Sequence, residues 1–280
     1  MAVIIDGTAI AEKVRNEVRS GISDLVRERG EAARPSMALI LVGNNMVSHN
    51  LVRMKAHDCE QVGIIPRIIE LPEETHEDAL LSFIETLNRD DSVNAILCQL
   101  PVPQQISTKK LLAAIDTSKD VDGFTARIDA DKTDIAACTP AGIMRMLREY
   151  DIDVKGKHCV VVGRSNIVGK PMAMQLLLHD ATVTVCHSKT QNLSSFTKQA
   201  DILIVAVGHA RLITADMVKE GAVVIDVGMN YPEGKPVGDV DFAEVSKRAS
   251  YISPVPGGVG PMTRAYLLKN CLELAKQYRR

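Results

Sequence analysis

Residues 160–169 read VVVGRSNIVG, an apolar run that ends on a glycine and leads into a helical pattern. A strand, a tight turn and a helix in this order let a dinucleotide pyrophosphate bind exposed backbone N–H groups at the helix N-terminus. The spacing departs from G-x-G-x-x-G, because Ser165 stands at the second glycine position and Gly169 comes one residue late. The stretch therefore predicts a nucleotide-binding turn, and an ordinary tight turn stays open as the alternative.

The end of the next predicted strand indicates which nucleotide binds. An NAD enzyme usually places Asp or Glu there to bind the ribose 2′-hydroxyl. This chain instead has His187, Ser188 and Lys189, and the first turn offers Arg164. A cation and hydroxyls suit a 2′-phosphate, which arginine binds with a fork of donors. We predict NADP as the cofactor, with ordinary surface polar residues as the alternative reading.

Strand and helix patterns alternate along the rest of the chain. Strands are expected at 38–43, 66–71, 95–100, 159–162, 182–185, 202–207 and 223–227. Helices are expected at 8–29 with Thr8 as its cap, and at 45–62, 76–88, 169–178, 192–199 and 214–220. A further helix follows the Gly/Pro-rich loop 253–261 and extends to Gln277. Such alternation predicts parallel sheets with right-handed crossovers.

A stretch without periodicity, 118–137, separates the two halves. After it, Thr139 and Pro140 open a helix, with Thr139 as the N-cap and Pro140 in the first turn. The fold class we expect is α/β with two domains and a cleft between them. An N-terminal α/β catalytic domain would span 1–139 and be completed by a C-terminal helix at 261–280. A Rossmann-type nucleotide-binding domain would span 140–260.

Composition excludes several classes of protein. The 280 residues are 46% hydrophobic and 24% charged, with a net charge of −2. A nucleic-acid-binding protein would need a basic face to displace phosphate counterions. No apolar run approaches the roughly 20 residues that span a bilayer, and the N-terminus lacks the basic start of a secretory signal. We predict a cytoplasmic protein without nucleic-acid or membrane partners.

The six cysteines are scattered and include no C-x-x-C pair. Most of them lie in apolar runs, where a thiol behaves as a small hydrophobic group. We therefore expect reduced core residues, and the lack of clustered Cys and His predicts no metal site.

Candidate catalytic residues follow the predicted strands of the first half. Ser48, Leu51 and Lys55 fall at helical spacing and share a face that can overhang the carboxyl ends of the sheet. Gln99 lies at the end of strand 95–100, and Asp122 lies in a short charged segment after it. Taken singly, a solvated lysine and capping or turn roles for Gln99 and Asp122 remain the ordinary alternatives.

A set of motifs runs along nearly the whole chain. It comprises Val42-Gly43 with Ser48 and Lys55, Gln99-Leu100-Pro101-Val102-Pro103, Lys119-Asp120-Val121-Asp122-Gly123, Cys138-Thr139-Pro140, the turn from Gly163 to Pro171, Asp226-Val227-Gly228, and residues Pro254 to Thr263. In order and spacing this set resembles the bifunctional methylenetetrahydrofolate dehydrogenase/methenyltetrahydrofolate cyclohydrolase family. The resemblance implies oxidation of 5,10-methylenetetrahydrofolate by NADP⁺ and hydrolysis of the methenyl product to 10-formyltetrahydrofolate.

The resemblance also implies residue roles and an assembly. Lys55 would be the general acid/base of hydrolysis, Gln99 would position it, and Asp122 would bind the pterin amino group and ring N–H. A cationic substrate and partial desolvation both favour neutral Lys55. Family members are commonly homodimers. The substrate-binding candidates are Ser48, Leu51, Leu100, Pro101, Pro254 and Gly257, and the cofactor-binding candidates are Gly163, Arg164, Ser165, Ser188 and Met229.

One position departs from the family pattern, which has tyrosine four residues before the lysine. Leu51 stands there in this chain, and His57 replaces a second basic residue beyond Lys55. Leucine fills the volume but offers neither a π-face nor a hydroxyl. Two alternatives therefore stay open: a dehydrogenase with weak cyclohydrolase activity, and a folate- and nucleotide-binding protein without catalysis.

Overall fold

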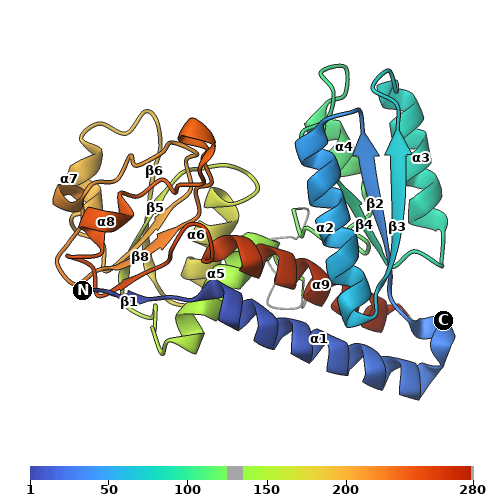
Figure 1. The fold of residues 1–280 in the computed structure, drawn as a ribbon, viewed down its shortest axis with the longest axis horizontal. Coiled ribbons are helices and arrows are strands. Elements are labelled where there is room, and N and C mark those ends of the chain that lie inside the picture. The colour runs from blue at the N-terminus through green and yellow to red at the C-terminus, as the bar shows by residue number, and fades with distance from the viewer. Residues whose placement is uncertain (125–134, 279–280) are drawn as a thin grey trace. The chain divides into compact units, whose positions relative to one another are not determined.

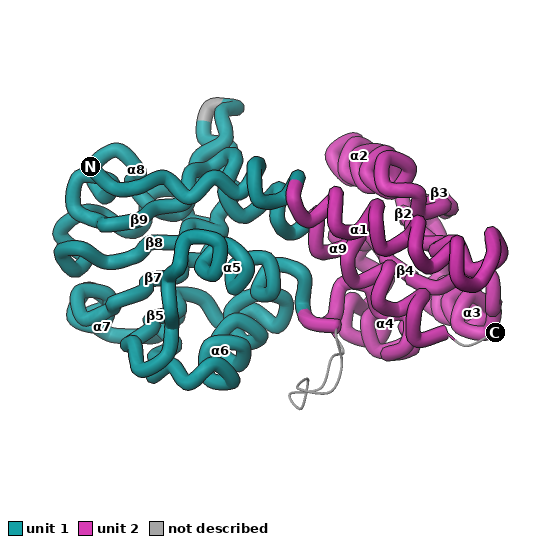
Figure 2. The backbone as a smooth tube through the Cα atoms, turned by 90° about the horizontal axis from the view of Figure 1, so that it is seen from below, with its two compact units in different colours: residues 1–12, 137–263 teal, residues 13–136, 264–280 magenta. Residues whose placement is uncertain are grey.

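The computed structural model describes residues 1–124 and 135–278, which form two compact units (Figure 2). Unit 1 comprises Met1–Glu12 and Ala137–Thr263, and unit 2 comprises Lys13–Ala136 and Arg264–Arg280. Helices α1 (Gly7–Arg29) and α9 (Val259–Gln277) contribute residues to both units. Among the helices of the described residues, none is long and apolar enough to cross a membrane. The predicted two-domain α/β fold with parallel sheets is confirmed.

Unit 2 is built on a three-stranded parallel sheet with the order β3-β2-β4 (Figure 1). The central strand is buried along its whole length because it has a neighbour on each side and helices on each face. Residues at even positions, such as Ala38 and Ile40, pack against Leu80 and Ile84 of α3. On the opposite face, Met37 contacts Cys59 of α2. The elements are β2 (Ser36–Val42), β3 (Ile65–Leu71), β4 (Ala95–Cys98), α2 (Met46–Val62), α3 (Glu77–Arg89) and α4 (Thr108–Ala114), with a 3₁₀ turn η1 at Glu31–Ala33.

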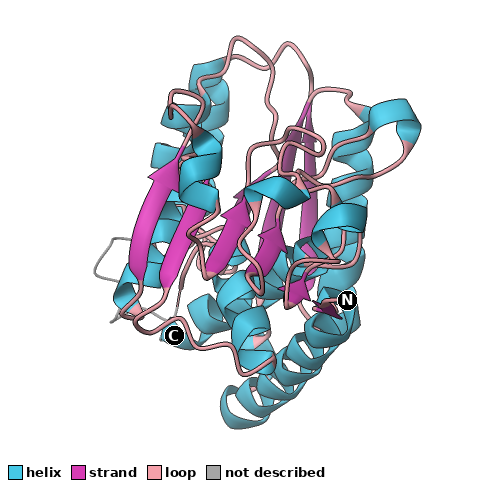
Figure 3. Cartoon of the chain, turned by 90° about the vertical axis from the view of Figure 1, so that its left-hand side faces the viewer, coloured by secondary structure: helices cyan, strands magenta, loops and turns pink. Residues whose placement is uncertain are grey.

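Unit 1 contains a six-stranded parallel sheet with the order β1-β9-β8-β7-β5-β6. Figure 3 shows its strands running side by side with helices on both faces. Apolar residues of the strands, such as Val160 and Leu203, form one core with Val218 and Val245 from the surrounding segments. The strands are β1 (Val3–Ile4), β5 (His158–Val162), β6 (Thr182–Cys186), β7 (Ile202–Val205), β8 (Val223–Asp226) and β9 (Tyr251–Ile252). The helices are α5 (Cys138–Glu149), α6 (Gly169–Leu178), α7 (Leu193–Thr197) and α8 (Phe242–Val245), with 3₁₀ turns η3 (Ala215–Met217) and η4 (Pro232–Gly234).

Several local predictions were wrong. The cap of α1 is Asp6, whose carboxylate accepts the Ala9 N–H at 3.0 Å, rather than Thr8. Helix α5 begins at Cys138, so Thr139 lies inside it and its hydroxyl bonds that of Thr263 at 2.8 Å. The helix expected at 214–220 is only the 3₁₀ turn η3.

Other predictions are confirmed or extended. All six cysteines, each within the described residues, are buried thiols that form no disulfide. Of the stretch 118–137, which was expected to lack periodicity, the structure describes residues 118–124 and 135–137. Residues 118–124 form turns and no helix. Strands β1 and β9, of two residues each, and the short helices α4 and α8 were not predicted.

Candidate active site

Helix α2 carries three of the predicted site residues. It begins directly after β2, where the Asn45 side chain accepts the Ser48 N–H at 3.0 Å and caps the helix. Ser48 is buried, Leu51 is 37% exposed, and Lys55 is half-buried. Lys55 therefore lies at the border between the buried face of α2 and solvent, where a long side chain can reach a polar partner.

Lys55 and Gln99 meet although 44 residues separate them in the sequence. The Lys55 Nζ donates to Gln99 Oε1 at 2.9 Å. Gln99 follows β4, is buried, and donates through Nε2 to the Leu100 carbonyl at 2.6 Å. The following peptide bond, Leu100–Pro101, is cis. The loop after β4 thus brings Gln99 to the Lys55 amino group, with the predicted residues Leu100 and Pro101 directly following it.

Asp122 completes a cluster of ionisable groups around Lys55. Burial raises the pKa of Asp122 to about 6, the charge of Lys55 opposes that rise, and the charge of Asp120 adds to it. The thiol of Cys98, the last residue of β4, interacts electrostatically with both Asp122 and Lys55. Burial raises its pKa to about 12, so it stays protonated at neutral pH. Sequence reasoning treated Cys98 only as a core residue and missed its place beside the cluster.

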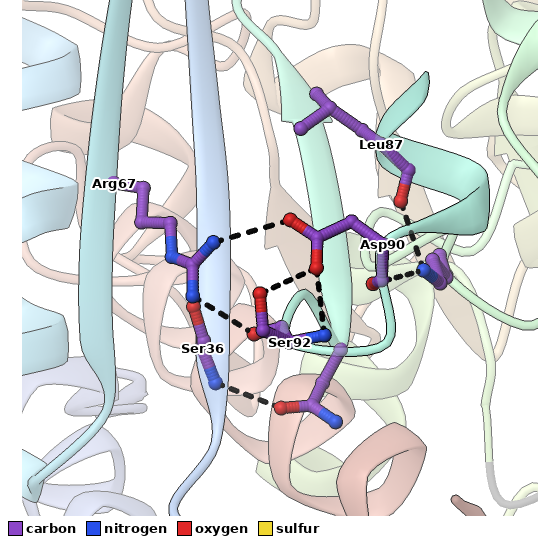
Figure 4. Close-up of polar contacts among 7 residues, drawn as sticks. Ser36, Arg67, Leu87, Asp90 and Ser92 are labelled. Carbon is purple, nitrogen blue, oxygen red and sulfur yellow. Dashed lines mark hydrogen bonds and ion pairs between the residues drawn. The ribbon is translucent and has the colours of Figure 1, made fainter. Parts of the chain in front are cut away.

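Lys119, in the same motif as Asp122, has a structural role. Its buried Nζ donates to the carbonyls of Leu87 and Asp90 at 2.8 Å each, at the C-terminal end of α3. Figure 4 shows both carbonyls, with the Asp90 carboxylate held by Ser92 and Arg67. A cation at this position satisfies helix carbonyls that lack intrahelical partners. Lys119 therefore anchors the segment that leads to Asp122.

The residues around Asp122 are held by hydrogen bonds of their own. The Gly123 N–H donates to the Asp120 carboxylate at 3.2 Å, and Gly123 adopts a positive φ of 71°. From α9, the Asn270 amide donates to the carbonyls of Val121 and Ala136 at 2.9 Å each. These bonds fix the backbone on both sides of Asp122, so its carboxyl group is presented from a constrained turn.

In unit 1, the predicted nucleotide-binding turn follows β5 and closes tightly. A Cβ atom at Gly163 would lie 2.2 Å from the Ala206 carbonyl oxygen, and Gly163 has a φ of 123°. A Cβ atom at Gly169 would lie 2.2 Å from the Gly163 carbonyl oxygen. Only glycine fits at either position. The third glycine of the turn is therefore needed at position 169, one residue later than in G-x-G-x-x-G, because the start of α6 packs against the Gly163 carbonyl.

Ser165 occupies the second glycine position for a physical reason. Its hydroxyl oxygen accepts the N–H groups of Val168 and Gly169 at 3.2 and 3.3 Å, at the start of α6. Arg164 and Ser165 are exposed in this turn. The hydroxyl and guanidinium groups near a helix N-terminus form a donor set that fits phosphate.

The end of β6 lies next to this turn, because the Gly163 N–H donates to the Cys186 carbonyl at 2.8 Å. Residues 187–190 form a second turn, in which the His187 N–H donates to the Thr190 hydroxyl at 2.9 Å. Ser188 and Lys189 are exposed there. No acidic residue occupies the strand end, so the position lacks the carboxylate that binds a ribose 2′-hydroxyl.

A pocket of about 240 Å³ in unit 1 gathers three further predicted residues, Met229, Pro254 and Gly257. The loop after β8 supplies Met229, and the Gly/Pro-rich loop before α9 supplies the other two. The paired hydroxyl residues Thr139 and Thr263 also line it. Sequence reasoning gave neither threonine a place in a site. Pro254 and Gly257 thus belong to unit 1, whereas Ser48, Leu51, Leu100 and Pro101 belong to unit 2 with Lys55.

Two buried carboxylates shape the loops of this pocket. Asp239 accepts the N–H groups of residues 207–209 at 2.7 to 2.9 Å, and Asp226 accepts those of Gly228, Asp239 and Val240. Burial raises the pKa of Asp226 to about 6, although these hydrogen bonds oppose the rise. The motif residue Asp226 is therefore a loop organiser, and its partner Asp239 carried no sequence signal of its own.

Comparisons with known proteins agree with this geometry. Two family models match, the tetrahydrofolate dehydrogenase/cyclohydrolase catalytic domain over residues 5–122 and its NAD(P)-binding domain over residues 137–279. The bifunctional protein FolD of Halalkalibacterium halodurans is 51% identical over 280 residues, which is 99% of each chain. The solved structure of the bifunctional enzyme FolD from Campylobacter jejuni has a TM-score of 0.94 at 48% identity and covers 99% of each chain. The Trypanosoma brucei enzyme, solved with NADP and an inhibitor, has a TM-score of 0.92 at 35% identity, covering 99% of this chain and 98% of that one.

Proposed function

Because the chain belongs to the tetrahydrofolate dehydrogenase/cyclohydrolase family, we propose that it carries out both reactions of that family's bifunctional members. It oxidises 5,10-methylenetetrahydrofolate with NADP⁺ and hydrolyses the methenyl product to 10-formyltetrahydrofolate. Both reactions belong to one-carbon metabolism. The observation that carries the proposal is the 2.9 Å bond from Lys55 to Gln99, within reach of the Asp122 charge.

The Lys55–Gln99 pair supplies what hydrolysis of a methenyl cation requires. A base must take a proton from the water that attacks the one-carbon centre. Lys55 donates one N–H to Gln99 Oε1, and once the amine has lost a proton this bond would orient its lone pair. A cationic substrate repels an ammonium group and so favours the neutral amine. After attack, protonated Lys55 returns a proton to the ring nitrogen as the carbon–nitrogen bond breaks, and the hydroxyl group of the adduct releases its proton to solvent as the formyl carbonyl forms.

Asp122 recognises the pterin in this proposal. An ionised carboxylate accepts hydrogen bonds from an amino group and an adjacent ring N–H, and charge-assisted bonds are the stronger kind. Its pKa of about 6 leaves Asp122 ionised at neutral pH. In this proposal Ser48, Leu51, Leu100 and Pro101 are the substrate-binding residues of unit 2, and Pro254 and Gly257, which line the 240 Å³ pocket, are those of unit 1.

NADP fits the residues of unit 1. Gly163 and Ser165 offer the pyrophosphate a close backbone approach, and Arg164 with Ser188 suits the 2′-phosphate, because β6 ends without an acid. Met229 lines the 240 Å³ pocket. Bound NADP⁺ supplies the hydride acceptor. The protein's contribution to that step is alignment, since hydride transfer needs no acid or base from the chain.

The alternative of a dehydrogenase with little cyclohydrolase activity rests only on Leu51. The Halalkalibacterium halodurans relative, matched over its full length, is described as bifunctional. The chain also retains Lys55, Gln99 and Asp122 together, which disfavours a binding protein without catalysis.

One assay separates these functions. Methylenetetrahydrofolate and NADP⁺ are supplied, and NADPH and the methenyl chromophore are followed together. We expect NADPH to form with little lasting methenyl signal, and the rate with NAD⁺ to be lower. Lasting methenyl accumulation would mean a dehydrogenase without efficient hydrolysis. Absence of NADPH with either nucleotide would contradict both activities.

A cytoplasmic homodimer is the assembly we propose. Strand β6 has a paired neighbour, β5, on one side only, and its Val185 side chain is 39% exposed. An edge strand offers unpaired backbone groups to a second copy. Light scattering after gel filtration should give twice the mass of one chain, and Val185→Lys should shift the protein toward monomer. Phe242→Lys, at a similarly exposed position on α8, is the control that should stay dimeric.

A further inference from the structure

A bidentate ion pair joins α2 to α9 within unit 2. Arg264 donates through Nε to Asp58 Oδ2 at 2.6 Å and through Nη2 to Oδ1 at 2.7 Å. The Asp58 side chain is only 9% exposed, and that of Arg264 is 31% exposed. A carboxylate this deeply buried requires a partner, and a fork of two parallel bonds is the strongest form of such a pair.

The pair lies one helical turn from Lys55. Residues three apart on a helix are surface neighbours, with about 5–6 Å between their Cβ atoms. Both charges act on the Cys59 thiol. Burial is the largest cause of its raised pKa, the charge of Asp58 raises the pKa further, and the charge of Lys55 lowers it. Asp58 and Lys55 therefore act in the same local environment.

The other groups that face Lys55 come from two neighbouring segments. Asp122 lies in the turn after residue 119, and the Cys98 thiol and Gln99 amide lie at the end of β4. On α2 itself Asp58 lies one turn from Lys55, and Glu60 also acts on the Cys59 thiol. The carboxylates near Lys55 therefore include Asp122, which Asp120 also influences, and Asp58, whose charge Arg264 neutralises.

We propose that Arg264 is a positioning residue for hydrolysis, which neutralises Asp58 so that Lys55 can act as an uncharged base. This inference rests on the proposed role of Lys55. If Arg264 were lost, the buried Asp58 carboxylate would stabilise the ammonium form of Lys55. An ammonium group cannot accept a proton from water, so hydrolysis would slow at neutral pH while hydride transfer, which needs no base, would continue.

The two single variants test the idea by the sign of their effects. Arg264→Met leaves Asp58 unpaired, and the acid limb of the pH profile for methenyl hydrolysis should move up by roughly one pH unit. On that limb the rate should fall about tenfold. Asp58→Asn leaves a guanidinium group unpaired, and the limb should move to lower pH. If the ion pair were purely structural, both single variants would lose hydrolysis activity, and the acid limbs of their pH profiles would not move in opposite directions.

Rescue and control variants complete the experiment. The double variant Asp58→Asn/Arg264→Met carries neither charge and should return the limb to the wild-type position. Arg264→Lys keeps the charge and should leave the limb in place. Dehydrogenase activity, measured on the same samples, should stay within about twofold of wild type throughout.

The outcomes separate this inference from the function on which it rests. Two results would overturn the role of Arg264. The acid limb could shift in the same direction in both single variants, or it could stay in place in both single variants and in the double variant. If Arg264→Met does not fold, the Asp58→Asn shift and the double variant decide alone. Full hydrolysis by Lys55→Met would instead overturn the proposed function.

Discussion

At the scale of single residues, Asp122 makes substrate binding depend on pH. Burial raises its pKa to about 6, so the carboxylate that accepts pterin hydrogen bonds is lost as the pH falls through that value. We expect the dehydrogenase KM for methylenetetrahydrofolate to be constant above pH 7 and to rise about tenfold per pH unit below 6. The dehydrogenase reaction is the suitable readout because it does not use Lys55 as a base.

The control for this prediction is Asp122→Asn. It removes the titrating group and weakens a charge-assisted contact by about 1.5–3 kcal/mol, so KM should be uniformly high and flat with pH. A KM that still rises below pH 6 in Asp122→Asn would assign the pH dependence to another group.

Leu51 is the residue at which this chain departs from the family pattern. It is 37% exposed on α2, one turn before Lys55, so a larger side chain has room there. Leu51→Tyr offers a π-face to an aromatic substrate, a contact of about 0.5–1.5 kcal/mol. We expect KM to fall by about twofold to tenfold or hydrolysis to accelerate. Leu51→Phe separates the ring from the hydroxyl, and unchanged constants in both variants would mean that the position does not contact substrate.

At the scale of elements, the β5–α6 turn depends on its glycine. Gly163→Ala would place a Cβ atom 2.2 Å from the Ala206 carbonyl oxygen and force alanine into a φ of 123°. Both the strain and the displaced backbone should lower the Tm and raise the Kd for NADP at least tenfold. A calorimetric titration with NADP gives the Kd.

Gly156 provides the matched control. It also has a positive φ, 70°, but no atom lies within 4 Å of a Cβ built there. Gly156→Ala should therefore cost only the backbone strain, about 1–2 kcal/mol, and leave the Kd for NADP unchanged. Equal effects of the two variants on NADP binding would show that the turn at Gly163 makes no close contact with the cofactor.

Local sequence predicted the buried apolar strands and the long amphipathic helices. The continuous apolar run 38–43 and the periodic pattern 8–29 gave bounds within two residues of β2 and α1. Strands β1 and β9 are two residues each; Val3 of β1 pairs with Tyr251 of β9, and β9 also pairs with β8. Such pairing depends on tertiary structure, and no local pattern reports it.

The same limit applies to the candidate site. Helix spacing and strand ends made Lys55, Gln99 and Asp122 candidates, and the family resemblance supplied their roles. Asp58 and Arg264 are 206 residues apart, and neither carries a motif, so only the folded chain reveals their ion pair. Thr139 was predicted as a cap because Thr before Pro often is one, yet its hydroxyl partner is Thr263.

At the scale of the whole molecule, both ends of the chain complete units formed mainly by other segments. Residues 1–12 pair with the sheet of unit 1, where Ile5 donates its N–H to Ile252. The last part of α9 belongs to unit 2, where Asn270 holds the segments before and after residues 125–134. Each unit therefore needs a distant part of the chain, and the turn that presents Asp122 depends on the C-terminal helix.

In the proposed mechanism Lys55, held by Gln99, is the base of methenyl hydrolysis. The most direct test is hydrolysis of preformed methenyltetrahydrofolate by Lys55→Met, followed by loss of the methenyl chromophore, with NADPH formation measured in parallel. We predict that hydrolysis by Lys55→Met falls to the uncatalysed rate while hydride transfer remains measurable. Wild-type hydrolysis in Lys55→Met would contradict the claim.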